Sequence, residues 1–192
     1  MFRFKSLLFA VIFIFLLTSR SIIYAKEPVT AAASTKESHF IHAFSSSWTP
    51  LQLSCAPVSL FHDKADIYGI NIALWLGTFP TDVYGLNYST IANFVWGKHC
   101  GLSISCIWLV VNSNYGITAA PANMTAENHG IMLGIVNIGP MGDTVGNGIQ
   151  IGLINQAESG LQIGLINYNK HALLPWMPLL NWSWAKPGTK AE

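Results

Sequence analysis

Histidine and acidic side chains are the residues of this chain best suited to metal binding or acid–base chemistry. The histidines are His39, His42, His62, His99, His129 and His171. His39 and His42 have a spacing that two metal ligands could use, but no cysteine or carboxylate pair stands beside them to complete a zinc site. His62, Asp63 and Asp66 form a polar cluster that fits a solvated turn better than a metal site. The sequence therefore predicts no metal site and no cofactor.

The serines and glycines of the chain carry no catalytic motif. The sequence Gly-x-Ser-x-Gly, which marks the nucleophile of many hydrolases, does not occur. The glycine-rich segment 139–148 lacks the Lys-Ser/Thr ending of a phosphate-binding loop. It fits a long hairpin loop, with Asp143 and Asn147 as turn residues. No pair of carboxylates stands out for acid–base work, so we expect a protein that is not an enzyme and has no catalytic residues.

Charged residues are scarce and unevenly chosen. They make up 10% of the chain, against about 25% in ordinary soluble domains. Beyond residue 25 there are seven lysines, nine acids and no arginine, so that part carries a formal charge of −2 (7 − 9). Proteins usually grip nucleic acid through Arg and Lys contacts to phosphate, so we expect no nucleic-acid partner. So few charges also imply that much of the surface lies out of water or is covered by uncharged polar groups.

Residues 1–25 have the pattern of a secretory signal peptide. Arg3 and Lys5 give a positive start, an uninterrupted apolar run follows over 7–17, and Ala25 offers a cleavage position. Eleven residues of helix rise about 16 Å, roughly half of a bilayer core of about 30 Å, so a stable transmembrane anchor is the weaker interpretation. We therefore expect an exported protein.

The remaining 167 residues (192 − 25) divide by composition into three parts. Residues 26–47 are small and polar, which predicts a flexible lead-in. Residues 48–184 contain the repeats described below and are long enough for a single β-repeat domain with its own core. Residues 185–192 form a polar tail.

The chain has three cysteines, Cys55, Cys100 and Cys106. An exported protein can form disulfides. Cys100 and Cys106 lie on one expected strand, about 20 Å apart if it is extended, and cannot pair with each other there. Cys55 could pair with either of them. The alternative is three buried thiols that act as small apolar side chains.

An internal repeat sets the architecture. Residues 148–155 read Gly-Ile-Gln-Ile-Gly-Leu-Ile-Asn, and residues 160–167 read Gly-Leu-Gln-Ile-Gly-Leu-Ile-Asn. The repeat extends back along the chain with decreasing fidelity, and its anchor glycines are Gly69, Gly85, Gly101, Gly116, Gly130, Gly148 and Gly160. Each is followed by Ile or Leu, and the spacing is about 15 residues. The unit 115–128 is the most degenerate, with Pro121 in its middle, and we expect a loop or a sheet edge there.

Within each unit, large apolar residues alternate with small or polar ones. In the sixth unit, for example, Ile149, Ile151 and Leu153 share one face, while Gln150 and Gly152 share the other. A period of two sorts residues onto the two faces of a strand, so we predict an all-β protein of tandem strand–turn repeats. Glycine inside a strand costs stability, and its recurrence there indicates close backbone approach or sharp curvature.

Three architectures fit this pattern. A small barrel could point the small residues inward and Ile and Leu toward lipid, as outer-membrane barrels do. A water-soluble barrel or sandwich would bury Ile and Leu instead. A β-solenoid would stack each unit on the previous one. We expect a curved sheet or small β-barrel, with a β-solenoid as the alternative, and a terminal strand over 179–184 that closes the array.

The two octets are followed by a segment with the pattern Asn-Lys-x-x-x-Leu-Pro-Trp-x-Pro-Leu-x-Asn at 169–181. Together they resemble a family of bacterial surface-repeat proteins built on Gly-Leu-Gln-Ile-Gly-Leu-Ile-Asn repeats. The start at Pro50-Leu-Gln-Leu-Ser, with Tyr68-Gly-Ile-Asn, is similar to that family as well. The resemblance covers residues 50–184, although residues 100–128 depart from the pattern and leave the number of strands open. It implies export and placement at the outer membrane or cell surface of a Gram-negative-type bacterium, and it brings no catalytic residues.

These observations together predict a non-enzymatic exported β-repeat protein at the cell surface or outer membrane, which acts as a structural or interaction module. The expected partner is outer-membrane lipid or a surface protein. The alternative function is a small β-barrel that binds an apolar ligand in its lumen. The alternative location is the periplasm or the medium.

Overall fold

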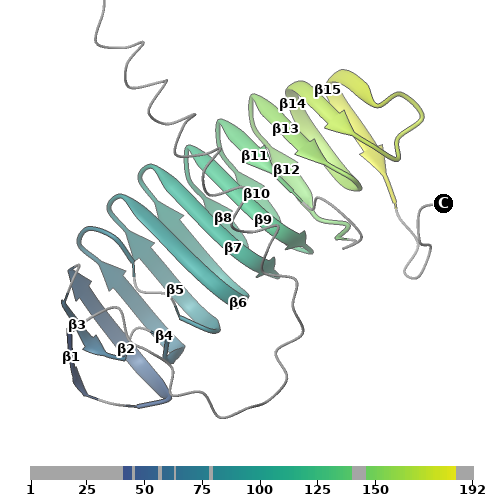
Figure 1. The fold of residues 1–192 in the computed structure, drawn as a ribbon. Coiled ribbons are helices and arrows are strands. Elements are labelled where there is room, and N and C mark those ends of the chain that lie inside the picture. Colours follow the sequence, from purple (N-terminus) through teal and green to yellow (C-terminus); the bar gives the residue numbers. More distant parts are fainter. Residues whose placement is uncertain are drawn as a thin grey trace, which may run out of the picture. The chain divides into compact units, whose positions relative to one another are not determined.

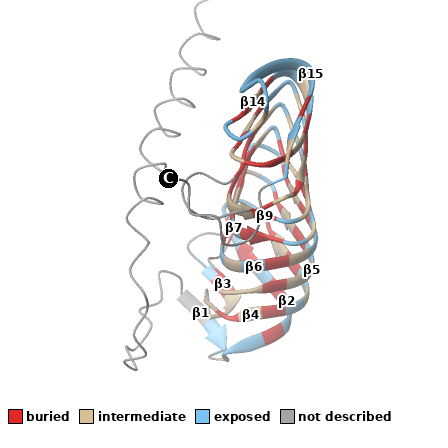
Figure 2. Ribbon diagram, turned by 90° about the vertical axis from the view of Figure 1, so that its right-hand side faces the viewer, coloured by how far each residue is buried: buried red, intermediate tan, exposed pale blue. Residues whose placement is uncertain are grey.

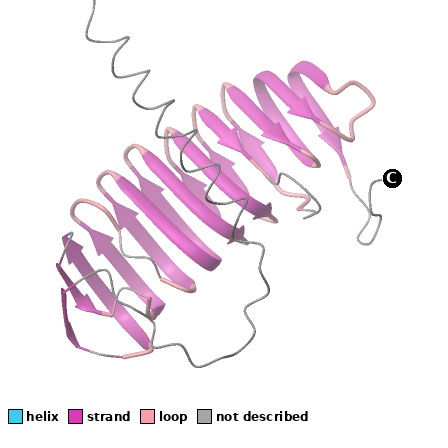
Figure 3. Ribbon diagram, in the orientation of Figure 1, coloured by secondary structure: helices cyan, strands magenta, loops and turns pink. Residues whose placement is uncertain are grey.

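Strands account for all regular secondary structure in the residues that the computed structural model describes, which are 41–44, 46–55, 58–62, 64–77, 80–139 and 146–184 (Figure 3). The chain divides into a unit of residues 1–35 and a unit of residues 36–192, and every described residue belongs to the second. The expected signal peptide, most of the expected lead-in and the expected polar tail lie outside the described residues.

The strands of the described residues follow one another closely along the chain (Figure 1). They are β1 Ile41–Phe44, β2 Trp48–Cys55, β3 Val58–Phe61, β4 Asp66–Ala73, β5 Val83–Ser89, β6 Ala92–Ser105, β7 Trp108–Asn114, β8 Ile117–Ala119, β9 Ala122–Asn128, β10 Ile131–Leu133, β11 Val136–Ile138, β12 Ile149–Ile151, β13 Ile154–Ala157, β14 Gly160–Asn169 and β15 Trp176–Ser183. All of them belong to one 15-stranded sheet that winds on itself.

Parallel pairing between successive repeats stacks the chain into coils with two sheet faces. We call face A the stack of β2, β4, β5, the second half of β6, β8, β10, β12 and the first half of β14. Face B is the stack of the first half of β6, β7, β9, β11, β13 and the second half of β14. Each complete coil gives one strand to each face. The fold is therefore a β-solenoid of about seven turns, which confirms the alternative that the sequence predicted.

The two ends of the stack depart from this parallel pattern. At the N-terminal end β3 pairs antiparallel with β2 and parallel with β1, which lies inside the segment 26–47 where the sequence predicts a flexible lead-in. At the C-terminal end β15 pairs antiparallel with β14. It begins at Trp176, earlier than the predicted 179–184, because an edge strand tolerates the missing N–H of Pro178.

The anchor glycines lie one above the other where the chain enters face A. Gly69, Gly85 and Gly101 are direct partners in the parallel register, and all three have positive φ angles. A side chain at Gly85 would collide with the carbonyl oxygen of Gly69, and the later anchor glycines meet the preceding one in the same way. Only glycine allows this approach, so its recurrence reflects the stacking of the coils.

The degenerate fourth unit is a regular coil. Its residues form β8 on face A and β9 on face B, where the sequence predicts a loop or a sheet edge. Pro121 lies between the two strands, at the turn from one face to the other. A proline needs no ladder hydrogen bond at such a turn, so it does not interrupt the solenoid.

Small and polar side chains fill the inside of the solenoid, while Ile and Leu point outward. Asn87 and Gln162 are fully buried, whereas their neighbours Leu86 and Ile163 are 37% and 40% exposed. Figure 2 shows buried residues at matching positions of successive strands. The interior also contains a small apolar cluster, made of Ile67, Val83, Val95, Leu109, Val111 and Ala120.

Candidate functional site

The outer surface of face A is a field of apolar side chains. Two outward columns run across the coils in the strand register. The first is Leu51, Ile70, Leu86, Leu102, Ile117, Ile131, Ile149 and Leu161, and the second is Leu53, Ile72, Tyr88, Ile104, Ala119, Leu133, Ile151 and Ile163. Single exposed apolar residues are common in soluble proteins, but a continuous field of them marks an interaction surface.

The apolar surface continues around the turn that joins face A to face B. We call this turn the leucine edge and define it by Leu74, Trp75, Ile107, Ile135, Leu153 and Leu165. Each of these side chains is between 47% and 66% exposed. Five of the described turns carry at least one of these residues, and the turns after β5 and β8 carry Ile91 and Pro121 at the same position. The leucine edge is therefore a largely apolar ridge along the solenoid.

A ladder of asparagines points into the coils. Because neighbouring residues of a strand point to opposite faces, the apolar residues beside these asparagines point outward. Six residues occupy the same position in successive strands of face B. They are Asn93, Leu109, Asn123, Asn137, Asn155 and Asn167. From Asn123 onward each Nδ2 donates a hydrogen bond of 2.8–2.9 Å to the Oδ1 of the next asparagine. Buried amides are costly unless they are paired, and parallel in-register strands pair them.

The same asparagines also donate hydrogen bonds to backbone carbonyl oxygens beside the leucine edge. Asn123, Asn137 and Asn155 each donate through Nδ2 to the carbonyl oxygen of Leu133, Ile151 and Ile163 respectively, at 2.8–3.0 Å. These carbonyls end the face A strands just before the turn. These carbonyls therefore accept hydrogen bonds from inside the protein. The side chains of the turn need not supply donors and can be apolar.

A second polar column lies behind face A. Asn71 Nδ2 donates to Asn87 Oδ1 at 2.8 Å, and Asn87 Nδ2 donates to Ser103 Oγ at 2.9 Å. Further along, Gln162 Nε2 donates to Gln150 Oε1 at 3.1 Å. The repeated glutamines and asparagines of the sequence thus form internal columns and do not line an outer binding face.

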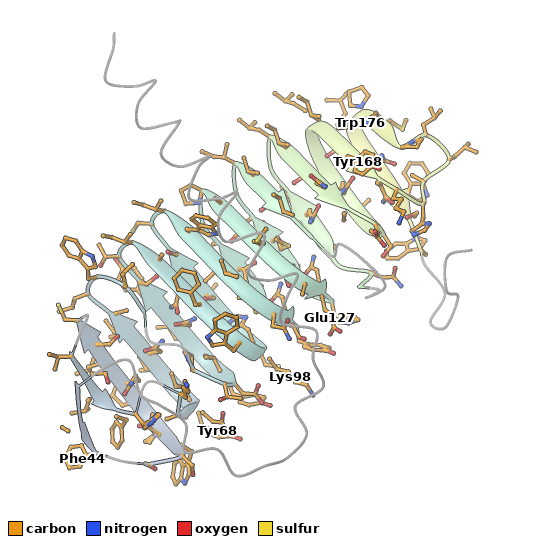
Figure 4. All side chains as sticks on the ribbon, in the orientation of Figure 1. Phe44, Tyr68, Lys98, Glu127, Tyr168 and Trp176 are labelled. Carbon is orange, nitrogen blue, oxygen red and sulfur yellow. The ribbon has the colours of Figure 1, made fainter. Side chains whose placement is uncertain are left out.

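Charged side chains of the described residues gather at the opposite edge of the solenoid, which we call the glycine edge because the anchor glycines begin there. They are Lys64, Asp66, Asp82, Lys98, Glu127, Glu158 and Lys170. Figure 4 shows Tyr68, Lys98 and Glu127 in a row along this edge. The sequence held a signal for this row, because Asp66, Asp82, Lys98 and Glu127 each precede an anchor glycine by three residues.

Hydrogen bonds and stacked rings organise the glycine edge. Asp66 Oδ1 accepts the backbone N–H of Asp82 at 3.1 Å, and Asp82 Oδ1 accepts that of Lys98 at 2.7 Å. The Tyr68 and Tyr84 rings stack with centroids 5.0 Å apart. The negative charge of Asp82 raises the pKa of the Tyr84 hydroxyl above its ordinary value. The edge combines charge with aromatic rings.

The histidines that could have done chemistry lie apart from one another. His39 and the side chain of His42 lie outside the described residues, as does Asp63. His129 stacks on Tyr115 with centroids 4.8 Å apart. His171 lies on the glycine edge, with Nε2 3.9 Å from Glu158 Oε2. Among the described residues, no three His, Cys, Asp or Glu side chains are placed to hold a metal ion.

His99 is the exception, because it is fully buried inside the coils. Its Nδ1 lies 3.3 Å from Asn114 Oδ1, which can only accept, so Nδ1 carries the proton. The Nε2 atom is buried without a hydrogen-bond partner. Burial lowers the pKa of His99, so the neutral ring is favoured in the folded protein. His99 is thus a structural residue of the interior.

The three cysteines are free thiols. Cys55 and Cys106 are exposed and Cys100 is partly exposed, so neither of the arrangements expected from the sequence, a disulfide or three buried thiols, is present. Cys106 lies at the leucine edge, directly before Ile107, while Cys100 directly precedes the anchor glycine Gly101. One coil therefore places a thiol near each of the two edges.

An open apolar hollow of about 430 Å³ lies over the last coils at the leucine edge. Its lining is made only of glycine and large aliphatic residues, namely Gly134, Ile151, Gly152, Leu153, Ile163, Gly164, Leu165 and Leu179. A site with no polar group has nothing to orient a polar substrate. The apolar lining of this hollow suits a hydrocarbon chain.

Comparison with protein-family models, with curated proteins and with solved structures gives no match to this chain. Within the described ranges, no helix has the length and hydropathy needed to cross a membrane.

Proposed function

We propose that this protein is a non-enzymatic, exported β-solenoid that associates with the outer membrane or cell surface and acts there as a structural or interaction module. The observation that supports this proposal best is the inverted distribution of side chains, with amides inside and Ile and Leu outside. An outer surface of this kind is stable when it faces lipid or an apolar partner, since exposure of that much apolar area to water is unfavourable.

An apolar ligand held in a barrel lumen, the alternative function, fits the interior of these coils poorly. Hydrogen-bonded amides such as Asn87, Asn137 and Asn155, all fully buried, occupy the interior of the coils. An apolar ligand placed there would leave these amides without partners, at a cost of about 1–3 kcal/mol each. Lipid fits the outer surface better than the inside.

The test is fractionation of cells that express the full chain, followed by an alkaline carbonate wash of the membranes. We expect the protein to be exported and to stay in the washed membrane fraction, because the apolar surface and not charge holds it there. A protein that is fully soluble in the periplasm or medium, and that floats with no lipid vesicle, would contradict the proposal.

A further inference from the structure

We infer that the long axis of the solenoid lies parallel to the membrane. The leucine edge is inserted among the acyl chains of a single leaflet, and the glycine edge lies at the lipid headgroups. This inference rests on the proposed function and adds the orientation and the depth. It follows from four features: the separation of charge from apolar side chains, the order of side chains between the two edges, the length of that path, and the pairing of the buried backbone.

The first feature is the separation of charge. Every charged side chain of the described residues lies at the glycine edge, whereas the leucine edge carries mainly aliphatic residues, with Trp75, the exposed Thr90 and the thiol of Cys106 among them. A protein that met water on all sides would have no reason to sort its charges in this way. A lipid leaflet imposes such an order, because charge is costly in hydrocarbon and favourable at the headgroups.

The second feature is the order of outward side chains along each face. On face B the sequence Ile166, Tyr168, Lys170 runs from the leucine edge to the glycine edge, and two coils of face A end at the stacked rings of Tyr68 and Tyr84. In these coils, the last one on face B and the first two with anchor glycines on face A, the order is apolar, then aromatic, then charged. Aromatic rings favour the boundary between hydrocarbon and headgroups, so this order matches the layers of one leaflet.

The third feature is the length of the path. On face A Leu74 lies six residue steps after Tyr68. At about 3.3 Å per residue this is about 20 Å. One leaflet contributes about 15 Å of hydrocarbon, with the headgroup region above it. The distance therefore fits insertion into one leaflet and is too short for a crossing of the whole bilayer.

The fourth feature is the pairing of the backbone at the inserted edge. In hydrocarbon each unpaired backbone group costs several kcal/mol. At the leucine edge Leu153 N–H donates to the Ile135 carbonyl at 3.0 Å, and Ile166 N–H donates to the Leu153 carbonyl at 2.9 Å. The asparagine ladder pairs the carbonyls of Leu133, Ile151 and Ile163. This turn can enter lipid without leaving those polar groups unpaired.

The native cysteines provide a test within a single coil. A protein that keeps only Cys106 (C55S/C100S) carries a fluorescent label at the leucine edge, and one that keeps only Cys100 (C55S/C106S) carries it next to an anchor glycine. The labelled proteins are bound to vesicles of phosphatidylethanolamine and phosphatidylglycerol. Spin labels placed either deep in the acyl chains or on the headgroups then quench the fluorescence.

We expect the label on Cys106 to be quenched more strongly by the acyl-chain spin label, and the label on Cys100 more strongly by the headgroup spin label. If the protein floats with vesicles but aqueous iodide quenches the Cys106 label as well as it does without vesicles, the inference fails and the proposed function stands. If the protein does not float with vesicles at all, both fail.

A matched pair of substitutions supplies an independent measurement. Leu153→Asp places a charge in the leucine edge, while Leu173→Asp makes the same change at a side chain that is 99% exposed in the loop between β14 and β15. We expect Leu153→Asp to lower the vesicle partition coefficient at least about tenfold, because a charge in hydrocarbon costs more than 1.4 kcal/mol. Leu173→Asp should leave it within about twofold. Equal losses in the two variants would overturn the inference, with circular dichroism as the control for folding.

Discussion

The interior of the early coils differs from the interior of the late coils. Between β4 and β7 it holds an apolar cluster that includes Val83, Leu109 and Val111, all buried. From β9 to β14 the asparagine ladder takes its place. The early anchor glycines are 16 residues apart and the last two are 12 apart. The length of a unit does not set its interior, because the late unit from Gly130 to Gly148 spans 18 residues and still holds the ladder residue Asn137.

Leu109 marks the boundary between these two regions. It occupies the ladder position, in register with Asn93 on one side and Asn123 on the other. Because a leucine cannot donate, Asn123 Oδ1 is buried without a hydrogen-bond partner. Asn93 turns its Nδ2 toward Asn87 Oδ1 instead. The early region therefore combines an apolar cluster with the Asn71–Asn87–Ser103 column, whereas the late region carries the asparagine ladder. Substitutions can separate these two contributions.

The largest effect is expected from Asn137→Leu in the late region. The change removes the bond from Asn123 Nδ2 and leaves Asn155 Oδ1 without its donor, while the carbonyl of Ile151 loses one of its two. We expect the free energy of unfolding to fall by about 3 kcal/mol or more, as measured by urea denaturation. Asn112→Leu, at an exposed asparagine of β7, is the control and should change it by less than about 0.5 kcal/mol. Similar values for the two variants would contradict the ladder.

A smaller effect on stability is expected from an asparagine placed in the early region. Two such variants can be compared with each other. Leu109→Asn and Val111→Asn both remove apolar burial, but only the first places an amide in register with Asn123, whose Oδ1 is unpaired. We expect Leu109→Asn to cost about 1–2 kcal/mol less than Val111→Asn in urea denaturation. A greater cost for Leu109→Asn would show that an amide at the ladder position does not offset the apolar burial lost there.

The smallest effect is expected from His99, which is fully buried inside the coils. Because burial lowers its pKa below the ordinary 6.5, the unfolded chain binds the proton more readily than the folded one. The stability is therefore complete above about pH 6.5 and falls as the pH drops below it. His99→Asn places an amide in register with Asn114 and should flatten this dependence between pH 7 and pH 5. An unchanged pH profile would exclude His99 as its source.

Much of the fold could be predicted from single residues and their spacing. The alternation of Ile149, Gln150 and Ile151 predicted strands, and the repeated anchor glycines predicted that each unit approaches the next closely. The row of charges three residues before the glycines was present in the sequence, although its meaning appears only when the coils are stacked. The coil from β8 to β9 could not be predicted, since Pro121 is compatible with a turn as well as with a loop.

The sequence by itself determined a β-protein of stacked repeats with two chemically distinct strand faces. Which face is inside became clear from the stacked coils, because an alternation of Ile and Gln is the same pattern whether the isoleucines are buried or exposed. The physical reason is the parallel register, which places Asn137, Asn155 and Asn167 at one position in neighbouring coils, about 4.8 Å apart, where each amide pairs the next. With the polar groups paired inside, the outer surface is free to be apolar.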